Sequence, residues 1–113
     1  MQVSLLPIGQ DVRSPLDVLN PLNITRAGSL TAYRTLTITP ITLGKNTAAT
    51  QMTYAYAYTE VNPTLQTLPI VVQAVDVVVL RSSQAVIITF ASDSNTYQQN
   101  LHYFNDFLRT LQF

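Results

Sequence analysis

The stretch that most constrains the fold is the valine-rich run at residues 70–80, IVVQAVDVVVL. β-Branched side chains lose freedom in a helix and pack well in a strand. Nearly every position is apolar, as in a strand covered on both faces, and the charged Asp76 interrupts the run. A short polar link at residues 81–84 leads to a second apolar run at 85–91. Two strands joined in this way predict an antiparallel hairpin.

The C-terminal segment predicts one long amphipathic helix. Residues 92–95 are N-cap types, and Asp93 or Ser94 can accept a hydrogen bond from a free amide of the first turn. Apolar residues then recur at steps of four, three, four and three, which puts them on one helix face: Tyr97, Leu101, Phe104, Leu108 and Leu111. A helix of about 18 residues spans roughly 27 Å, enough to cross about five strands at ~4.8 Å spacing. We expect it to cover the sheet; docking into a partner's groove is the alternative.

The first part of the chain predicts an edge strand and a short helix. Residues 2–6 alternate weakly and are expected to form the strand, which Pro7 and Gly9 end. Ser14-Pro15 is typical of an N-cap followed by proline at the first helical position. Because the residue before Pro21 is pushed away from helical angles, we expect a short or broken helix near 15–20, then an irregular path through 27–29.

Two further strands are expected before the valine-rich run. In residues 33–43, Leu36 and Ile38 share one face, and the parity of apolar residues changes after Pro40, which fits an edge or a bulge. A turn at 44–46 leads to residues 48–59. Here large side chains, methionine and tyrosine, alternate with small or polar ones, as in a half-buried antiparallel strand. Residues 60–68 are expected to form a polar loop.

The order is therefore strand, helix, strand, turn, strand, loop, strand, turn, strand, helix. This predicts an α+β fold, a mostly antiparallel sheet of about five strands covered by a long C-terminal helix. Residues 1–113 are expected to form a single domain.

Composition narrows the classes of function. Charged residues make up 11% of the chain, against about 25% in an average domain. The 6 basic and 6 acidic side chains cancel and form no basic run, so no nucleic-acid partner is expected. The absence of cysteine excludes disulfides, thiol catalysis and thiolate metal sites. No apolar stretch is long enough for a transmembrane segment, and the first ten residues lack the regions of a signal peptide.

Few residues are candidates for chemistry. His102 is the single histidine, and a zinc site usually needs several His or Cys ligands. Asp76 is a candidate buried charge, which Arg34 or Arg81 could pair with across the sheet. No nucleophile-elbow motif is present. We therefore expect no enzyme, no cofactor and no metal; an enzyme would need a deep pocket where Asp76 or His102 meets an arginine and a hydroxyl.

The alternating tyrosines are the candidate partner or ligand surface. Tyr54, Tyr56 and Tyr58 lie on one strand face, and Glu60 follows them at the start of the expected loop. Tyrosines in such a row can stack on bases, sugars or a protein partner. Core and cross-strand packing is the other interpretation of the same pattern.

Three segments together resemble the PsbP-like superfamily: TITPITLGKNTAATQMTYAYAY, VVQAVDVVVLRSSQAVIITFAS and YQQNLHYFNDFLRTLQF. The resemblance covers most of residues 33–113. It implies an α/β/α sandwich and mostly non-enzymatic roles in docking, assembly and stabilisation of larger complexes, often outside the cytoplasm. The chain departs from the family in lacking the upstream strands, a full first helix and a lipobox cysteine, which implies a truncated member or an excised domain. No functional residue can be carried over.

Two functions from different classes follow from the sequence. The first is a non-catalytic binding or assembly module of an exported bacterial protein, with the sheet face or the loop at 60–68 as its contact surface. The alternative is a structural subunit of a phage or particle that self-associates, for instance as a homodimer, through an edge strand at residues 2–6 or 33–43.

Overall fold

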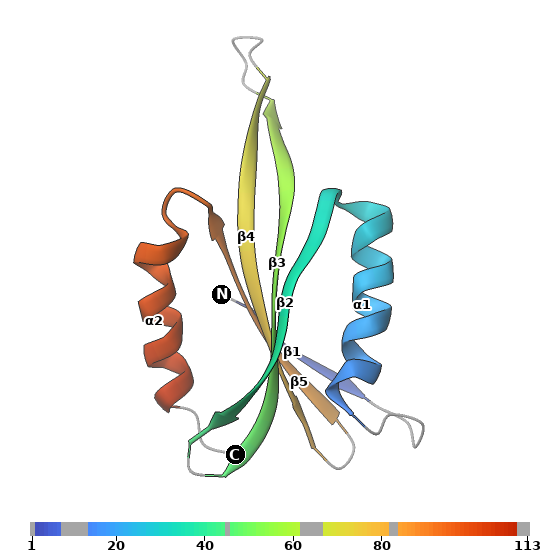
Figure 1. Cartoon of the computed structure of the whole chain (residues 1–113), viewed down its shortest axis with the longest axis vertical. Coiled ribbons are helices and arrows are strands. Elements are labelled where there is room, and N and C mark those ends of the chain that lie inside the picture. The colour runs from blue at the N-terminus through green and yellow to red at the C-terminus, as the bar shows by residue number, and fades with distance from the viewer. Residues whose placement is uncertain (1, 8–13, 45, 62–66, 82–83, 111–113) are drawn as a thin grey trace.

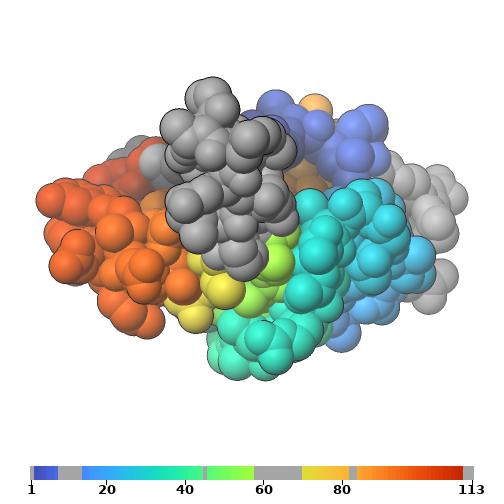
Figure 2. All heavy atoms as spheres, turned by 90° about the horizontal axis from the view of Figure 1, so that it is seen from above, coloured from blue at the N-terminus to red at the C-terminus, as the bar shows by residue number. Residues whose placement is uncertain are grey.

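The computed structural model describes residues 2–7, 14–44, 46–61, 67–81 and 84–110. The elements follow one another as β1 (Gln2–Pro7), α1 (Pro15–Ser29), β2 (Thr31–Leu43), β3 (Thr47–Val61), β4 (Thr67–Leu80), β5 (Gln84–Asp93) and α2 (Tyr97–Thr110). Within these residues, five strands form one antiparallel sheet in the spatial order β1-β5-β4-β3-β2. The two helices lie on opposite sides of the twisted sheet (Figure 1), and the view from above shows α2, sheet and α1 as three layers (Figure 2). The predicted α+β class and its sandwich arrangement are confirmed.

The valine-rich run forms β4, at the centre of the sheet between β5 and β3. The predicted hairpin is confirmed, because β4 and β5 pair from Val72 with Asp93 to Leu80 with Ala85. The Arg81 N–H donates to the Gln84 carbonyl at 2.7 Å and closes the link, whose middle residues lie outside the described part of the chain. A strand in this position has one layer of side chains under each helix, which explains why almost every residue of it is apolar.

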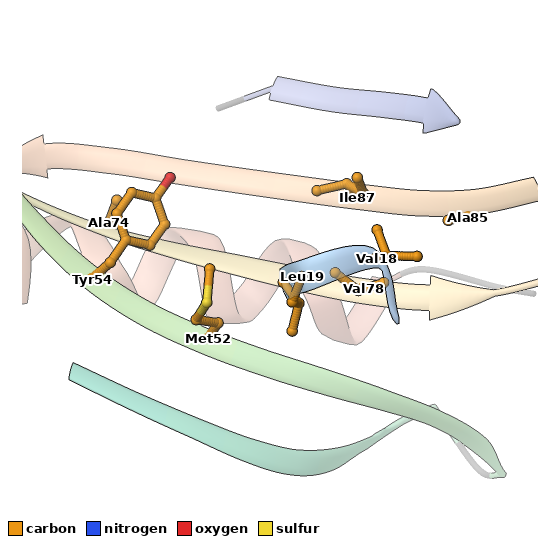
Figure 3. Packing of buried hydrophobic residues seen from close by; sticks show 8 residues of the cluster. All are labelled: Val18, Leu19, Met52, Tyr54, Ala74, Val78, Ala85 and Ile87. Carbon is orange, nitrogen blue, oxygen red and sulfur yellow. The ribbon is translucent and has the colours of Figure 1, made fainter. Parts of the chain in front are cut away.

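Each face of the sheet has its own core. On the α1 side, Val18 and Leu19 pack onto the sheet residues that Figure 3 labels: Met52, Tyr54, Ala74, Val78, Ala85 and Ile87. On the α2 side the buried cluster comprises Leu43, Ala49, Val75, Val77, Val79, Ile88, Phe104 and Leu108. The predicted apolar stripe of the C-terminal helix is confirmed for Tyr97, Phe104 and Leu108, which are buried, while Leu111 lies outside the described residues.

The prediction of a short or broken first helix is wrong. α1 runs without interruption from Pro15 to Ser29, with Pro15 in the first turn as predicted and Pro21 inside the helix. The Ser14 N–H donates to the Asp17 carboxylate at 3.2 Å at its start. Pro21 cannot donate a backbone hydrogen bond, which costs the helix stability. The burial of Val18, 4% exposed, and Leu19, 0% exposed, offsets this cost.

The strand at residues 33–43 also differs from its prediction. β2 is an edge strand, as Pro40 indicated, but its pairing with β3 is regular through Pro40 and shifts instead between Thr31 and Arg34 and between Thr35 and Thr37. The second shift separates Leu36 from Ile38, because Leu36 lines a hollow beside α2 whereas Ile38 pairs with Met52 of the α1-side core. The bulge therefore lies before Pro40, where the sequence contains no proline or glycine to mark it.

Two element boundaries are corrected as well. β3 continues through Glu60 and Val61, and β4 already begins at Thr67, so both ends of the expected polar loop at 60–68 are paired strand. Residues 62–66 lie outside the described chain. α2 begins at Tyr97 and not at the predicted Asn95, and the Asp93 carboxylate accepts the Asn95 N–H at 2.8 Å ahead of it.

Candidate functional site

A buried ion pair between the sheet and α1 marks the candidate site. Asp76 projects from β4 toward α1 and is 0% exposed. Its Oδ2 accepts a hydrogen bond from Nη1 of Arg26 at 2.5 Å, and the Arg26 side chain is 17% exposed. A buried carboxylate is costly unless it is paired and hydrogen-bonded, and Arg26 supplies both requirements.

Two hydroxyls complete the surroundings of Asp76. Thr89 of β5 donates to Asp76 Oδ1 at 2.7 Å, and the Tyr54 hydroxyl of β3 lies at 3.4 Å from the same oxygen. The cross-strand register explains this convergence, because Asp76 stands opposite Thr89 on one side and Met52, two residues from Tyr54, on the other. Among the described residues, no buried side-chain polar atom is left without a hydrogen-bond partner.

The guanidinium of Arg26 is held over an aromatic ring. Its Cζ lies 4.5 Å from the centroid of Tyr54, within the range of a cation–π contact. Burial works to lower the pKa of Arg26, but the hydrogen bond and the charge of Asp76 outweigh it, and the pKa is raised above its ordinary value. Burial, and then the charge of Asp76, also raise the pKa of Tyr54 above 10.0. Arg26 is therefore a fixed cation and Tyr54 a neutral phenol at physiological pH.

A second pair of polar side chains supports this arrangement. The Tyr33 hydroxyl of β2 donates to Asn23 Oδ1 of α1 at 2.5 Å, and the Thr35 hydroxyl is 3.4 Å from the same atom. The Tyr33 ring lies 5.6 Å from that of Tyr54, which in turn stacks on Tyr56 at 6.3 Å. The middle of α1 is thus tied to β2, β3 and β4 through polar and aromatic contacts.

A cavity of about 480 Å³ opens beside the ion pair, on the α1 side of the sheet. It lies between α1 and the β1–β5 edge, and its lining comprises Gln2, Ser4, Leu6, Leu22, Arg26, Tyr54, Tyr56, Ile87, Thr89 and Ala91. Among the described residues of this lining, Arg26 is the charged one, and Asp76 neutralises its charge. An apolar cavity with a few convergent polar groups is the usual form of a binding site.

The other side of the sheet has a smaller and more polar hollow. It measures about 370 Å³ between α2 and strands β2 and β3, and uncharged amides and hydroxyls line much of it. None of the described residues that border this hollow is charged. We therefore place the candidate site on the α1 side, where the larger cavity meets the buried charges.

The structure separates the residues that the sequence singled out. Asp76 and Tyr54 are brought together, and half-buried Tyr56 lines the same cavity. The side chains of Tyr58 and Glu60 lie outside the described part of the structure. His102 is exposed on α2, on the other side of the sheet from Asp76, with its ring 3.9 Å from that of Tyr103.

The predicted partner of Asp76 was wrong. Arg34 lies exposed on the edge strand β2, and Arg81 follows the end of β4, whereas Arg26 makes the ion pair. Arg26 was missed because the helix was expected to end before it. The spacing of Leu19, Leu22 and Arg26 at steps of three and four is the signal that would have placed Arg26 on the buried face of a continuous helix.

The described residues contain no group of three or more His, Cys, Asp or Glu side chains that could hold a metal ion. None of the described helices is both long and apolar enough to cross a membrane.

Comparison with known proteins relates the chain through its fold. No family model matches it, and no curated protein matches it. Its structure is similar to that of PA94, a Pseudomonas aeruginosa protein of unknown function suggested to be a regulator, with a TM-score of 0.64 and 12% sequence identity. The match covers 98% of this chain and 81% of PA94. At this identity the likeness shows a shared fold alone.

Proposed function

We propose that this chain is a non-catalytic binding module that holds a segment of a partner protein in the α1-side cavity. The observation that carries the proposal is the lining of that cavity, where apolar side chains surround hydrogen-bonding groups next to an ion pair whose charges cancel. Such a surface favours a ligand with an apolar body and uncharged hydrogen-bonding atoms. A peptide segment, with carbonyl oxygens between apolar side chains, meets both conditions.

The polar groups of the lining are rich in donors. The guanidinium of Arg26 has five N–H donors, of which one bonds to Asp76, and the hydroxyl-bearing residues Ser4 and Tyr56 line the same cavity. An anionic ligand would approach the Asp76 carboxylate as well as Arg26. Repulsion by Asp76 would then offset most of the attraction to Arg26. Neutral carbonyl acceptors avoid that repulsion and suit this lining better.

The position of Asp76 favours binding over catalysis. The carboxylate is fully buried, and Arg26 and Thr89 bond to its two oxygens, so a substrate would have to break the ion pair to reach it. Breaking a buried pair costs about 3 kcal/mol or more. The docking and assembly roles implied by the resemblance to the PsbP-like superfamily agree with a module of this kind.

A photo-crosslinking experiment tests the proposal. Ala91 is exposed and lines the cavity, while Ala48 is an exposed alanine on β3 outside it. A benzophenone amino acid at position 91, in the host that makes the protein, is expected to capture one continuous segment of another protein. The same group at position 48 should not capture it.

The captured segment is then synthesised, and its binding is measured by calorimetry. Ala91→Phe, which fills the cavity, is expected to weaken binding at least about tenfold, and Ala48→Phe should leave it unchanged. Equal capture from both positions, or equal affinity of the two phenylalanine variants, would exclude this cavity as the binding site.

A further inference from the structure

The two edges of the sheet differ in how well they are protected against pairing with another strand. β2 carries the exposed charge of Arg34, a proline at position 40 and two shifts of register, and Ala32 within it has a positive φ of 54°. Charges, prolines and bulges are the features by which natural edge strands avoid pairing. Leu36 and Ile38 are exposed on β2, but they lie beside these features.

β1 has almost none of this protection. Its sequence, QVSLLP, contains no charged residue, and all six residues pair with β5 without a shift. Val3, Leu5 and Leu6 are 53%, 61% and 43% exposed. Among the described residues, no strand pairs with the outer side of β1. A regular, apolar and uncharged edge is a ready partner for another strand.

We propose that β1 pairs antiparallel with β1 of a second copy of this chain, so that two sheets join across a two-fold axis. The proposal goes beyond the binding function above and does not depend on it. A second copy fits this edge because it brings the same uncharged strand, and a net charge of zero causes no overall repulsion between copies. An isologous contact of this kind is also the commonest route to a homodimer.

The alternation of β1 defines the register. Val3 and Leu5 pair with Ile88 and Val86, which belong to the α2-side core, so these two side chains lie on the α2 face of the sheet. A two-fold axis at Ser4 places Val3 of each copy opposite Leu5 of the other on this face. Four exposed apolar side chains then cover one another. A shift of the β1–β1 register by one residue would abolish these contacts.

Exposed aromatic surface continues this apolar face. Tyr103 of α2 is 66% exposed, and it borders with Phe90 of β5 a hollow of about 260 Å³. Phe90 lies two residues from Ile88, the partner of Val3. In the joined sheet this exposed aromatic surface lies on the same face as Val3 and Leu5 of both copies.

Pairing would also affect the cavity on the other face. Gln2, Ser4 and Leu6 of β1 form its outer wall. In the proposed register, Gln2 stands opposite the second copy's Leu6, so the neighbouring strand extends the floor of each cavity. The two cavities would then face the same side of one sheet.

The oligomeric state in solution tests the inference. Light scattering after size exclusion is expected to give the mass of two chains for the wild type. Leu5→Lys puts a charge at the contact and should raise the dimer dissociation constant roughly tenfold or more. Ile24→Lys, at a 76% exposed position on α1, is the control and should remain dimeric. Circular dichroism checks that both variants are folded.

A single introduced cysteine tests the register. Because the chain contains no cysteine, Ser4→Cys can link across the axis only to its copy, and mild oxidation should give a covalent dimer. Thr39→Cys, exposed on β2, should form no covalent dimer under the same conditions.

A wild-type monomer at high concentration, or a covalent dimer formed through position 39 instead of position 4, would overturn the inference. Ala91→Phe is expected to dimerise normally, so failure of the binding function and failure of the dimer can be told apart.

Discussion

At the scale of single residues, the ion pair between Asp76 and Arg26 ties the first helix to the centre of the sheet. Asp76→Asn leaves a cation facing a neutral amide, with Arg26 only 17% exposed. We expect a loss of about 3 kcal/mol in the free energy of unfolding, measured by urea denaturation. The double variant Arg26→Met/Asp76→Leu should recover most of this loss, because it removes both charges and fills the same space.

Equal stability of Asp76→Asn and the wild type would show that the pair contributes little. A variant that stays fully folded yet loses a measurable activity would instead point to chemistry at Asp76.

The raised pKa of Tyr54 predicts that the protein loses stability at alkaline pH. Its pKa is raised above 10.0 in the folded state by burial and by the charge of Asp76. Above pH 10 the unfolded chain releases this proton while the folded protein retains it. The contribution of Tyr54 to the free energy of unfolding is therefore fully present below pH 10. Above pH 10 it is lost by about 1.4 kcal/mol per pH unit.

Tyr54→Phe should reduce that slope by one proton, as measured by urea unfolding between about pH 9 and pH 11. Burial raises the pKa of Tyr97 in the same direction, so part of the slope remains in the variant. An unchanged slope in Tyr54→Phe would contradict the assignment.

At the scale of elements, α1 contains an unfavourable residue that packing overcomes. Pro21 lies inside the helix on its exposed side and cannot donate the usual hydrogen bond to the fourth residue before it. Pro21→Ala is expected to raise the free energy of unfolding by about 1–3 kcal/mol, followed by thermal or urea denaturation. Pro15→Ala is the matched control and should change little, since proline is favourable in the first turn.

The elements most readily predicted from sequence were those whose pattern and packing agree. In three elements the apolar residues of the sequence pattern are also the ones that the structure buries: β4, the strand at 85–91 and the stripe of α2. The prediction of α1 was wrong because the backbone preference at Pro21 favours a break in the helix, whereas the burial of Val18 and Leu19 favours a continuous helix. The bulge in β2 had no sequence mark at Leu36, so only its pairing with β3 shows it.

At the scale of the whole molecule, the α/β/α arrangement could be predicted and the candidate site could not. Asp76 stood out in the sequence as a charge in an apolar strand. Its partner Arg26 is 50 residues away, and the cavity beside them takes its walls from four different elements. Such a site depends on register and on the exact length of α1, which short-range patterns do not determine.

The order of the strands has a consequence for how the chain folds during synthesis. Strands β2, β3 and β4 each pair with the next strand to emerge, so these contacts can form in sequence. β1 is made first but pairs with β5, where Gln2 meets Thr89. Because this loop must close before its contacts form, we expect the pairing of β1 with β5 to be a slow, late step. The most apolar edge of the protein is thus also the one that waits longest for its partner, and nascent chains stalled before β5 should be the most prone to aggregate.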